Sequence, residues 1–367
     1  MMRPAKILLV TDAVGGMWTY SVELGLALRR LGFRCKLAVI GPPPGPGRRL
    51  EARDLDLILT GLPLDWTAEE PDSLAQVGPK LAAIAARENA DLLQVGSAAC
   101  LAGGRFHCPT VAVQHSCVAT WWDAVRGGPL PPDLAWRRDM VRRGLERADV
   151  IIAPSAAHAD QTRRAYRLTK TVLSVHNGRR ATPVAERKAR DFVFTVGRLW
   201  DEGKNVRTLD RAAARIGVPF EAAGPLDGPN GASIRFESLA TPGELTSRAI
   251  ADKLASRPVF ASAALYEPFG LAVLEAALAG CPLVLSDIPT FRELWGEAAL
   301  FVDPRDDEGF ARIITDLIES PDWRLGLGLA AKRHARRLTT EATAQAMAAI
   351  YEGLLGEGAE LKLAGAA

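Results

Sequence analysis

Two glutamates separated by a glycine turn are the residues of this sequence best placed to do chemistry. Glu267 precedes the turn at Gly270, and Glu275 follows it on a helix that the apolar pattern predicts over about 271–279. The start of such a helix presents unpaired N–H groups and the positive end of the helix dipole, which together bind phosphate. The segment is therefore predicted to hold a diphosphate at the helix start.

Each glutamate is expected to bind a different part of one ligand. Glu275 lies about five residues into the helix, roughly 7.5 Å along its axis, which suits the ribose of a nucleotide whose phosphates occupy the helix start. Glu267 lies on the other side of the phosphates, where a transferred sugar would be. The backbone amides of Phe269, Gly270 and Leu271 would contact the phosphates. The alternative is two surface glutamates that the helix dipole merely favours.

Two cations follow the first predicted strand of the second half of the chain. Arg198 and Lys204 belong to VGRLWDEGKN (196–205), at a strand end from which they could reach a diphosphate. Two fixed positive charges could neutralise a leaving diphosphate, so no metal is expected. Either residue alone would also fit an ordinary exposed loop.

The first half of the chain has a second glycine turn. Gly15 and Gly16 stand between a predicted strand and a helix, where the backbone could approach a phosphate closely. The third glycine of a dinucleotide fingerprint is missing, and a plain tight turn is the alternative. His115 ends another predicted strand at the same sheet edge, although a lone histidine is usually a structural group.

Aromatic residues near these positions could bind an acceptor. Rings in a cleft stack on the C–H-rich faces of sugars, but they are equally suited to a protein core. The acceptor candidates, with one polar neighbour, are Trp18, Tyr20, Trp121, Trp122 and Asp123.

The elements that must position these residues alternate between short apolar strands and amphipathic helices. This alternation predicts an α/β fold of two Rossmann-like domains that face each other across a central cleft, with ligands beyond the carboxyl ends of the strands. The predicted domains are an N-terminal, acceptor-side domain over 1–180 and a donor domain over 191–339, joined by a linker over 181–190. A C-terminal helix at about 340–356 is expected to pack back onto the first domain.

The predicted strands are runs of apolar residues, as expected for strands covered on both faces. One further helix is predicted over 241–254, with Thr241 as N-cap and Glu244 closing a capping box. The strands lie at 5–12, 36–40, 55–60, 90–96, 110–115, 149–155, 191–198, 218–224, 258–263, 282–287 and 299–303.

Composition and charge limit the classes of function. The net charge of +2 over 367 residues gives no reason to expect nucleic acid binding. Five cysteines without a CxxC pair disfavour a disulfide framework or a zinc site. The N-terminus lacks a secretory pattern, and no apolar run approaches the roughly 18 residues that span a bilayer. We therefore expect a soluble cytoplasmic protein without a resident cofactor.

One helical stretch is strongly basic. Residues 134–150 predict an amphipathic helix whose basic face could contact anionic lipid head groups at the inner face of a membrane. A solvated charged face is the alternative, and the sequence does not indicate an oligomeric state. The basic residues are Arg137, Arg138, Arg142, Arg143 and Arg147.

Taken together, the motifs resemble those of the group 1, or family 4, retaining glycosyltransferases of GT-B fold. GRLWDEGKN (197–205) and LYEPFGLAVLEAALAGCPLVLSD (265–287) carry a resemblance that extends over nearly the whole chain. It implies that Arg198 and Lys204 bind the donor diphosphate, that Glu275 binds the ribose and that Glu267 binds the donor sugar.

The resemblance has consequences for the first half as well. It implies that an amide of the Gly15–Gly16 loop meets the donor phosphate and that His115 lies near the donor sugar. Two departures are visible. The spacing from arginine to lysine is six positions where many members have five, and HNGRR (176–180) places Arg179 where an acidic residue often follows the glycine.

The activity that the resemblance implies is metal-independent transfer of a hexose from a UDP- or GDP-linked sugar, with retention of configuration. The acceptor would be a saccharide or a lipid-linked glycan in polysaccharide or glycoconjugate synthesis. Other GT-B enzymes, such as a sugar-nucleotide epimerase or a phosphorylase, remain alternatives, as does a non-catalytic sugar-nucleotide-binding subunit.

Overall fold

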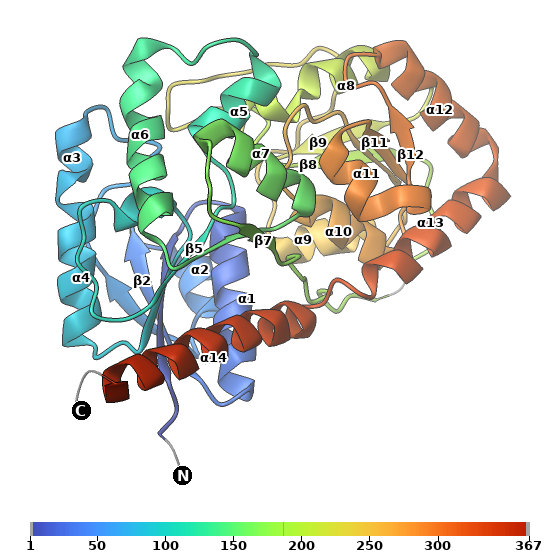
Figure 1. The fold of residues 1–367 in the computed structure, drawn as a ribbon. Helices are drawn as coiled ribbons and strands as arrows, with labels where there is room; N and C mark the ends of the chain where they lie inside the picture. Colours follow the sequence, from blue (N-terminus) through green and yellow to red (C-terminus); the bar gives the residue numbers. More distant parts are fainter. Residues whose placement is uncertain (1–2, 186, 365–367) are drawn as a thin grey trace. The chain divides into compact units, whose positions relative to one another are not determined.

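The computed structural model describes residues 3–185 and 187–364 and divides the chain into two compact units (Figure 1). Unit 1 comprises 1–123, 127–178 and 340–367, and unit 2 comprises 124–126 and 179–339. The chain therefore passes between the units around 123–127 and again at 178–179 and 339–340. The stretch 181–190, expected to be a linker, is grouped with unit 2.

Unit 1 is built on a seven-stranded parallel sheet with the order β3-β2-β1-β4-β5-β6-β7. Because β-branched and other apolar side chains point alternately to both faces, each face carries its own core. Leu8 and Val10 of β1 join one apolar cluster, whereas Ile7 and Leu9 join the other. The strands are β1 (Lys6–Asp12), β2 (Arg34–Ile40), β3 (Asp56–Leu59), β4 (Leu92–Val95), β5 (Thr110–Val113), β6 (Val150–Ala153) and β7 (Val172–Ser174).

Helices cover both faces of this sheet. Helix α5 (Val118–Val125) crosses the division between the two units. The other helices are α1 (Gly16–Arg30), α2 (Pro46–Glu51), α3 (Pro71–Ala75), α4 (Val77–Arg87), α6 (Pro132–Arg147), α7 (Ala156–Tyr166) and α14 (Thr340–Ala364), with the short 3₁₀ helix η1 (Ala98–Leu101).

The long helix α14 contributes to the core of unit 1 although it comes last in the chain (Figure 1). Met347 and Tyr351 are fully buried in the cluster that also contains residues of α1 and β1. The Tyr351 hydroxyl donates to the amide oxygen of Gln94 on β4. Near the helix start, the Thr340 hydroxyl donates to Glu23 Oε2 at 2.9 Å. Packing and polar contacts thus hold α14 against unit 1 between Thr340 and Tyr351.

Unit 2 has a five-stranded parallel sheet with the order β12-β11-β10-β8-β9. The strands are β8 (Val193–Val196), β9 (Phe220–Ala223), β10 (Val259–Ser262), β11 (Leu283–Ser286) and β12 (Leu300–Val302). The helices are α8 (Val206–Ala213), α9 (Ser247–Leu254), α10 (Leu271–Ala279), α11 (Pro289–Trp295), α12 (Asp307–Glu319) and α13 (Pro321–Ala335), with the 3₁₀ helices η2 (Glu202–Lys204) and η3 (Gly296–Ala298).

Two elements differ from the sequence prediction. Helix α9 begins at Ser247 with Thr246 as its N-cap, whose hydroxyl accepts from Ala249 N at 3.2 Å, so the predicted start at Thr241 is wrong. Gly243 has a positive φ of 79°, which no right-handed helix contains. Strand β7 was not predicted, because only three residues of its stretch pair with β6.

The order of the strands locates a ligand site in each unit. In doubly wound sheets a crevice opens beyond the carboxyl ends of the strands, at the point where the winding direction changes. In unit 1 that point lies between β1 and β4, and in unit 2 between β8 and β10. The segments that follow these four strands are therefore where functional residues are expected.

Candidate functional site

In unit 2 the loop after β8 is tied to the segment after β10. The carbonyl oxygen of Gly203 accepts from Leu265 N at 2.9 Å and from Tyr266 N at 3.2 Å. These bonds bring Lys204 close to Glu267, and Lys204 Nζ lies 2.5 Å from Glu267 Oε2. Both side chains are mostly buried, with 23% and 16% of their surface exposed. Two of the predicted residues thus meet at the β8–β10 switch point.

Asp201 organises the same loop. It is 8% exposed and accepts from Gly203 N at 2.9 Å and from Arg198 Nη2 at 2.8 Å. The Arg198 guanidinium also lies over the Trp200 ring, 5.6 Å from its centroid. Arg198 remains 43% exposed on its side chain, so it is oriented by its neighbours and still accessible to an anion.

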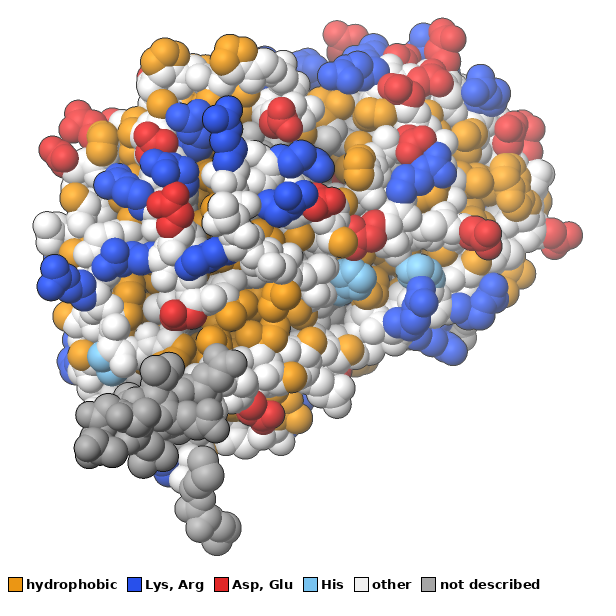
Figure 2. All heavy atoms as spheres, viewed as in Figure 1, with side chains coloured by type: hydrophobic (Ala, Val, Ile, Leu, Met, Phe, Trp, Pro, Cys, Tyr) orange, Lys and Arg blue, Asp and Glu red, His pale blue; other side chains and the backbone are white. Residues whose placement is uncertain are grey.

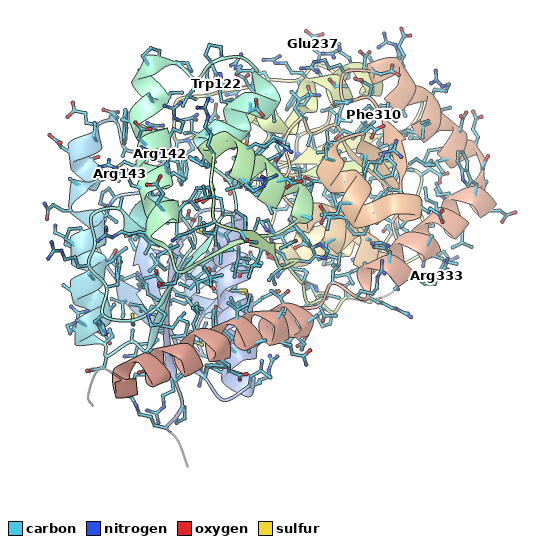
Figure 3. All side chains as sticks on the ribbon, viewed as in Figure 1. Trp122, Arg142, Arg143, Glu237, Phe310 and Arg333 are labelled. Carbon is cyan, nitrogen blue, oxygen red and sulfur yellow. The ribbon has the colours of Figure 1, made fainter. Side chains whose placement is uncertain are left out.

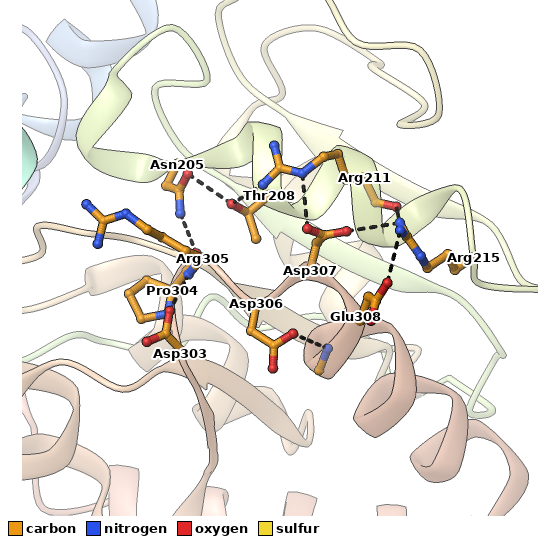
Figure 4. A network of polar contacts seen from close by, with 11 residues as sticks. Asn205, Thr208, Arg211, Arg215, Asp303, Pro304, Arg305, Asp306, Asp307 and Glu308 are labelled. Atoms are coloured by element: carbon orange, nitrogen blue, oxygen red, sulfur yellow. Dashed lines mark hydrogen bonds and ion pairs between the residues drawn. The ribbon is translucent and has the colours of Figure 1, made fainter.

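A second network holds the end of this loop (Figure 4). Asn205 adopts a left-handed φ of 50°, and its amide nitrogen donates to Ala263 O at 2.9 Å and to Pro304 O at 2.6 Å. Beyond it, Asp307 pairs with Arg211 at 3.1 Å and with Arg215 at 2.9 Å. Asparagine tolerates this backbone conformation better than most residues. The turn that presents Lys204 is therefore supported from β10 and from the start of α12.

The glycine turn before α10 is as predicted: the helix begins at Leu271 and ends at the cap Gly280. Gly270 is its N-cap, with a φ of 91°, and Phe269 is buried. No side chain caps the helix start, and its first turn carries no acidic residue. Such a start, with Lys204 nearby, can bind an anion through backbone N–H groups and the helix dipole.

Glu275 lies one turn further along α10 and has a partner that the sequence did not predict. Arg179 Nε is 2.6 Å from Glu275 Oε1, and the two side chains are 11% and 25% exposed. The only sequence signal was that Arg179 stands where an acidic residue was expected. A carboxylate held in this way keeps further lone pairs for the hydroxyls of a ligand.

The residues predicted for the donor site in unit 2 therefore gather at one sheet edge and around one helix. They supply two cations and an uncapped helix start for an anion, and two carboxylates for hydroxyl groups. The residues are Arg198, Lys204, Glu267, Phe269, Gly270, Leu271 and Glu275.

In unit 1 the glycine turn follows β1. Gly15 is the N-cap of α1 with a φ of 82°, and Gly16 is the first residue of the helix. Asp12, at the end of β1, accepts from Val14 N at 2.7 Å and so shapes the loop. Burial raises the pKa of Asp12 to about 6, and the nearby carboxylate of Asp65 adds to this increase.

His115 lies just beyond β5. Its ring packs edge-on against Tyr20, with centroids 4.4 Å apart. Its Nε2 is buried and has no hydrogen-bond partner among the described residues. Burial, with a smaller contribution from His158, lowers the pKa of His115 to about 3. At neutral pH the ring is therefore uncharged, and Nε2 is available for a hydrogen bond.

The aromatic acceptor candidates fall into two groups. Trp18 and Tyr20 are buried in the core of unit 1, and Trp18 Nε1 donates to Glu51 at 2.9 Å. Their faces are covered by protein, which argues against the predicted stacking on a sugar. Trp121 and Trp122 on α5 are partly exposed, with ring centroids 6.5 Å apart, and Asp123 beside them is exposed. These three residues stay acceptor candidates.

Two of the five arginines on the basic helix α6 pair with acidic residues of the same helix. Arg142 pairs with Glu146 at 2.9 Å, Arg138 lies 3.6 Å from Asp139, and Arg147 donates to Gly104 O at 2.6 Å. Figure 2 shows acidic side chains among the basic ones over this helix, and Figure 3 labels Arg142 and Arg143 on it. A hydrogen bond to a carbonyl oxygen does not neutralise a guanidinium, so Arg137 and Arg147 keep their charge and the helix stays basic.

The described residues were compared with the patterns expected for a metal site and for a membrane-spanning helix. No group of three or more potential ligands among its histidines, cysteines and acidic residues is placed to hold a metal ion. Asp54 and Asp56 form an Asp-x-Asp sequence near the start of β3, where Arg53 and Lys36 pair with them. No helix within the described residues has the length and apolarity to cross a bilayer.

Comparisons with solved structures define the class of fold. Sucrose-phosphate synthase from Thermosynechococcus elongatus is 19% identical, with a TM-score of 0.76 over 96% of this chain and 100% of that one. The Anabaena protein HepE in complex with UDP and glucose is 18% identical, with a TM-score of 0.71 over 94% and 99%. With the two parallel sheets described above, this similarity identifies the fold as GT-B.

Sequence profiles then give the family. The profile "Glycosyltransferase Family 4" matches residues 14–180, and "Glycosyl transferases group 1" matches residues 190–320. The chain belongs to this family of group 1, or family 4, glycosyltransferases, as the motifs predicted.

Curated relatives match over shorter segments. O-antigen chain mannosyltransferase B of Escherichia coli is 34% identical over 19% of this chain. D-inositol 3-phosphate glycosyltransferase of Corynebacterium urealyticum is 30% identical over 33% of this chain. The matched segments span only 18% and 28% of these relatives' own lengths.

The turn at Gly270 makes a prediction for stability. Gly270→Ala would place a Cβ 3.2 Å from Phe291 and 3.4 Å from Glu267 at a φ of 91°. We expect a loss of about 1–2 kcal/mol in the free energy of unfolding, from the left-handed conformation together with crowding. Urea denaturation measures it. Gly217→Ala, where nothing lies within 4 Å and φ is ordinary, is the control and should change little.

The buried carboxyl of Asp12 makes a prediction for pH dependence. The pKa of Asp12 in the folded protein is about 6, above the usual aspartate value of 3.8. The folded state therefore favours the protonated carboxyl, and the stability that this gives is complete below pH 3.8 and is lost as the pH rises through 6. The difference amounts to up to about 3 kcal/mol. Urea denaturation between pH 4 and 7 should show a smaller decline in stability for Asp12→Asn than for wild type. If the free energy of unfolding depends on pH in the same way for both proteins, the raised pKa does not belong to Asp12.

Proposed function

We propose that this protein is a retaining glycosyltransferase that moves a hexose from a UDP- or GDP-linked sugar to a hydroxyl group. The acceptor is a saccharide or a lipid-linked glycan in polysaccharide or glycoconjugate synthesis. The observation that carries the proposal is the meeting of Lys204 and Glu267 beside the uncapped start of α10, with Glu275 one turn along the same helix.

The site suits the three parts of a nucleoside diphosphate sugar. The helix start, Lys204 and Arg198 provide positive charge for the diphosphate. Glu275 accepts from the ribose hydroxyls, and Glu267 accepts from hydroxyls of the sugar. Family membership supports this assignment, and the similarity to HepE, a protein solved in complex with UDP and glucose, makes UDP-glucose the first donor to test.

Lys204 and Glu267 neutralise each other in the structure, and donor binding would change what each of them contacts. A diphosphate at the helix start gives Lys204 a stronger anionic partner within reach. Glu267 then gains free lone pairs for sugar hydroxyls. Once the bound donor has replaced this mutual contact, both side chains are in place before charge develops on the leaving group.

The reaction is proposed to proceed on one face of the sugar. The bond between the anomeric carbon and the diphosphate oxygen breaks, and the acceptor oxygen bonds to that carbon from the same side. The acceptor proton passes to the departing phosphate oxygen, so the atoms and charges balance without a strong base. Arg198, Lys204 and the start of α10 stabilise the negative charge that develops on the diphosphate.

Removing the groups that bind the leaving diphosphate and the sugar tests this mechanism. Arg198→Ala and Glu267→Ala should each lower kcat/KM for transfer or for slow donor hydrolysis by about 10²–10³-fold, since each removes stabilisation of the transition state. Thermal melts of Arg198→Ala should stay close to wild type, because its side chain is 43% exposed. Glu267→Ala leaves the mostly buried Lys204 without its carboxylate partner, so this variant should melt at a lower temperature while its circular dichroism spectrum stays that of a folded protein. Arg312→Ala, on the exposed side of α12, is the matched control. Near-normal turnover in both site variants would overturn the assignment.

Ligand-induced stabilisation tests the donor class separately from turnover. UDP and GDP, with UDP-glucose and GDP-mannose, are screened by thermal shift. A nucleotide at 100 times its Kd should stabilise the protein by about 2.7 kcal/mol, and Glu275→Gln should reduce that shift. Stabilisation by the uridine nucleotides alone, or by the guanosine nucleotides alone, would identify the base of the donor. Nucleotide stabilisation without hydrolysis or transfer would indicate a binding subunit instead of an enzyme, and no shift with any of the four would contradict the proposal.

A further inference from the structure

We infer that Arg179 is a positioning residue that holds Glu275 ready for the ribose of the donor nucleotide. The inference rests on the proposed function, because it assigns Glu275 to the ribose. It adds a second residue to ribose recognition, one that comes from outside the two motifs around Arg198 and Glu267.

The contact between the two side chains is close and sheltered. Arg179 Nε lies 2.6 Å from Glu275 Oε1, at the short end for a charge-assisted hydrogen bond. Arg179 is 11% exposed and Glu275 is 25% exposed, so solvent screens the pair less than it screens a surface ion pair. The glutamate side chain is thereby restricted before any ligand arrives, which reduces the ordering that binding would otherwise require.

The backbone of Arg179 is fixed independently of its side chain. Arg179 N donates to Leu338 O at 3.2 Å. Asn177 and Gly178 before it are buried. Both Arg179 and Leu338 lie at points where the chain passes between the units. The backbone of Arg179 is thus held by a hydrogen bond that is separate from the side-chain contact with Glu275.

Arg179 could act on a ligand in two opposite ways. As a competitor it would occupy the carboxylate and have to be displaced by ribose hydroxyls, so its removal would tighten nucleotide binding. As a positioning residue it uses one part of the carboxylate and leaves lone pairs for the ribose, so its removal would weaken binding. The contact runs from Nε to Oε1, and a carboxylate offers about four acceptor sites, which favours positioning.

Ribose discrimination separates positioning from a general structural role. Isothermal titration calorimetry is used to compare UDP and GDP with their 2′-deoxy and 3′-deoxy forms, for wild type, Arg179→Gln, Arg179→Lys and Glu275→Gln. Wild type should prefer the ribonucleotide by about tenfold or more, as expected for hydrogen bonds to a charged group. Glu275→Gln should remove most of that preference.

Arg179→Gln should weaken ribonucleotide binding by about tenfold and leave deoxynucleotide binding nearly unchanged. Arg179→Lys should be intermediate, because it keeps the charge but lacks the guanidinium Nε. The double variant Arg179→Gln/Glu275→Gln should lose no more preference than Glu275→Gln alone, since the two residues act through one carboxylate. Arg312→Gln is the control and should match wild type.

The inference is overturned if Arg179→Gln prefers ribonucleotides over deoxynucleotides as strongly as wild type does, or if it binds ribonucleotides more tightly. Either result leaves the proposed function intact. Wild type that binds neither UDP nor GDP would overturn the proposed function and the inference with it. If Arg179→Gln does not fold, Arg179→Lys decides: a reduced preference supports positioning, and an unchanged one overturns it.

Discussion

The candidate site depends on the hydrogen bonds that join the loop after β8 to the segment after β10. The Gly203 carbonyl accepts from two successive amides, at Leu265 and Tyr266, and so fixes the distance between the chain segments that carry Lys204 and Glu267. Strand order alone brings the two segments to the same edge, but it does not set their separation. The ion pair between Lys204 and Glu267 follows from this connection, while Asp201 orients Arg198 within the same loop.

Much of this arrangement could be predicted from the sequence because it depends on local patterns. Continuous apolar runs identified the strands of both sheets apart from β7, and the glycines at 270 and 280 gave the bounds of α10. Family 4 membership and the GT-B fold followed from GRLWDEGKN and the EPFG segment. Arg198, Lys204, Glu267 and Glu275 could thus be named as site residues before their geometry was known, whereas Asp201 and Arg179 could not.

What could not be predicted depends on contacts between distant positions. The partner of Glu275 is Arg179, 96 positions earlier, and only the fold brings the two together. The composition of 11–32 could not show that Trp18 faces the core, since a ring near a glycine turn can point either way. The predicted start of α9 is wrong because Thr241 and Glu244 satisfy a capping pattern, whereas Gly243 adopts a conformation that excludes a helix.

The place of α14 in unit 1 has a consequence for how the chain folds during synthesis. Met347 and Tyr351 share a core with residues of α1 and of strands β1, β2, β4, β5 and β6. A chain that has been synthesised only as far as the end of β7 therefore has α1 on this face of the sheet but still lacks Met347 and Tyr351. Unit 2, made from 179–339, can form its own core in the meantime. Unit 1 can complete its core only after residues 340–351 have been translated, and until then chaperones can bind the incompletely covered face.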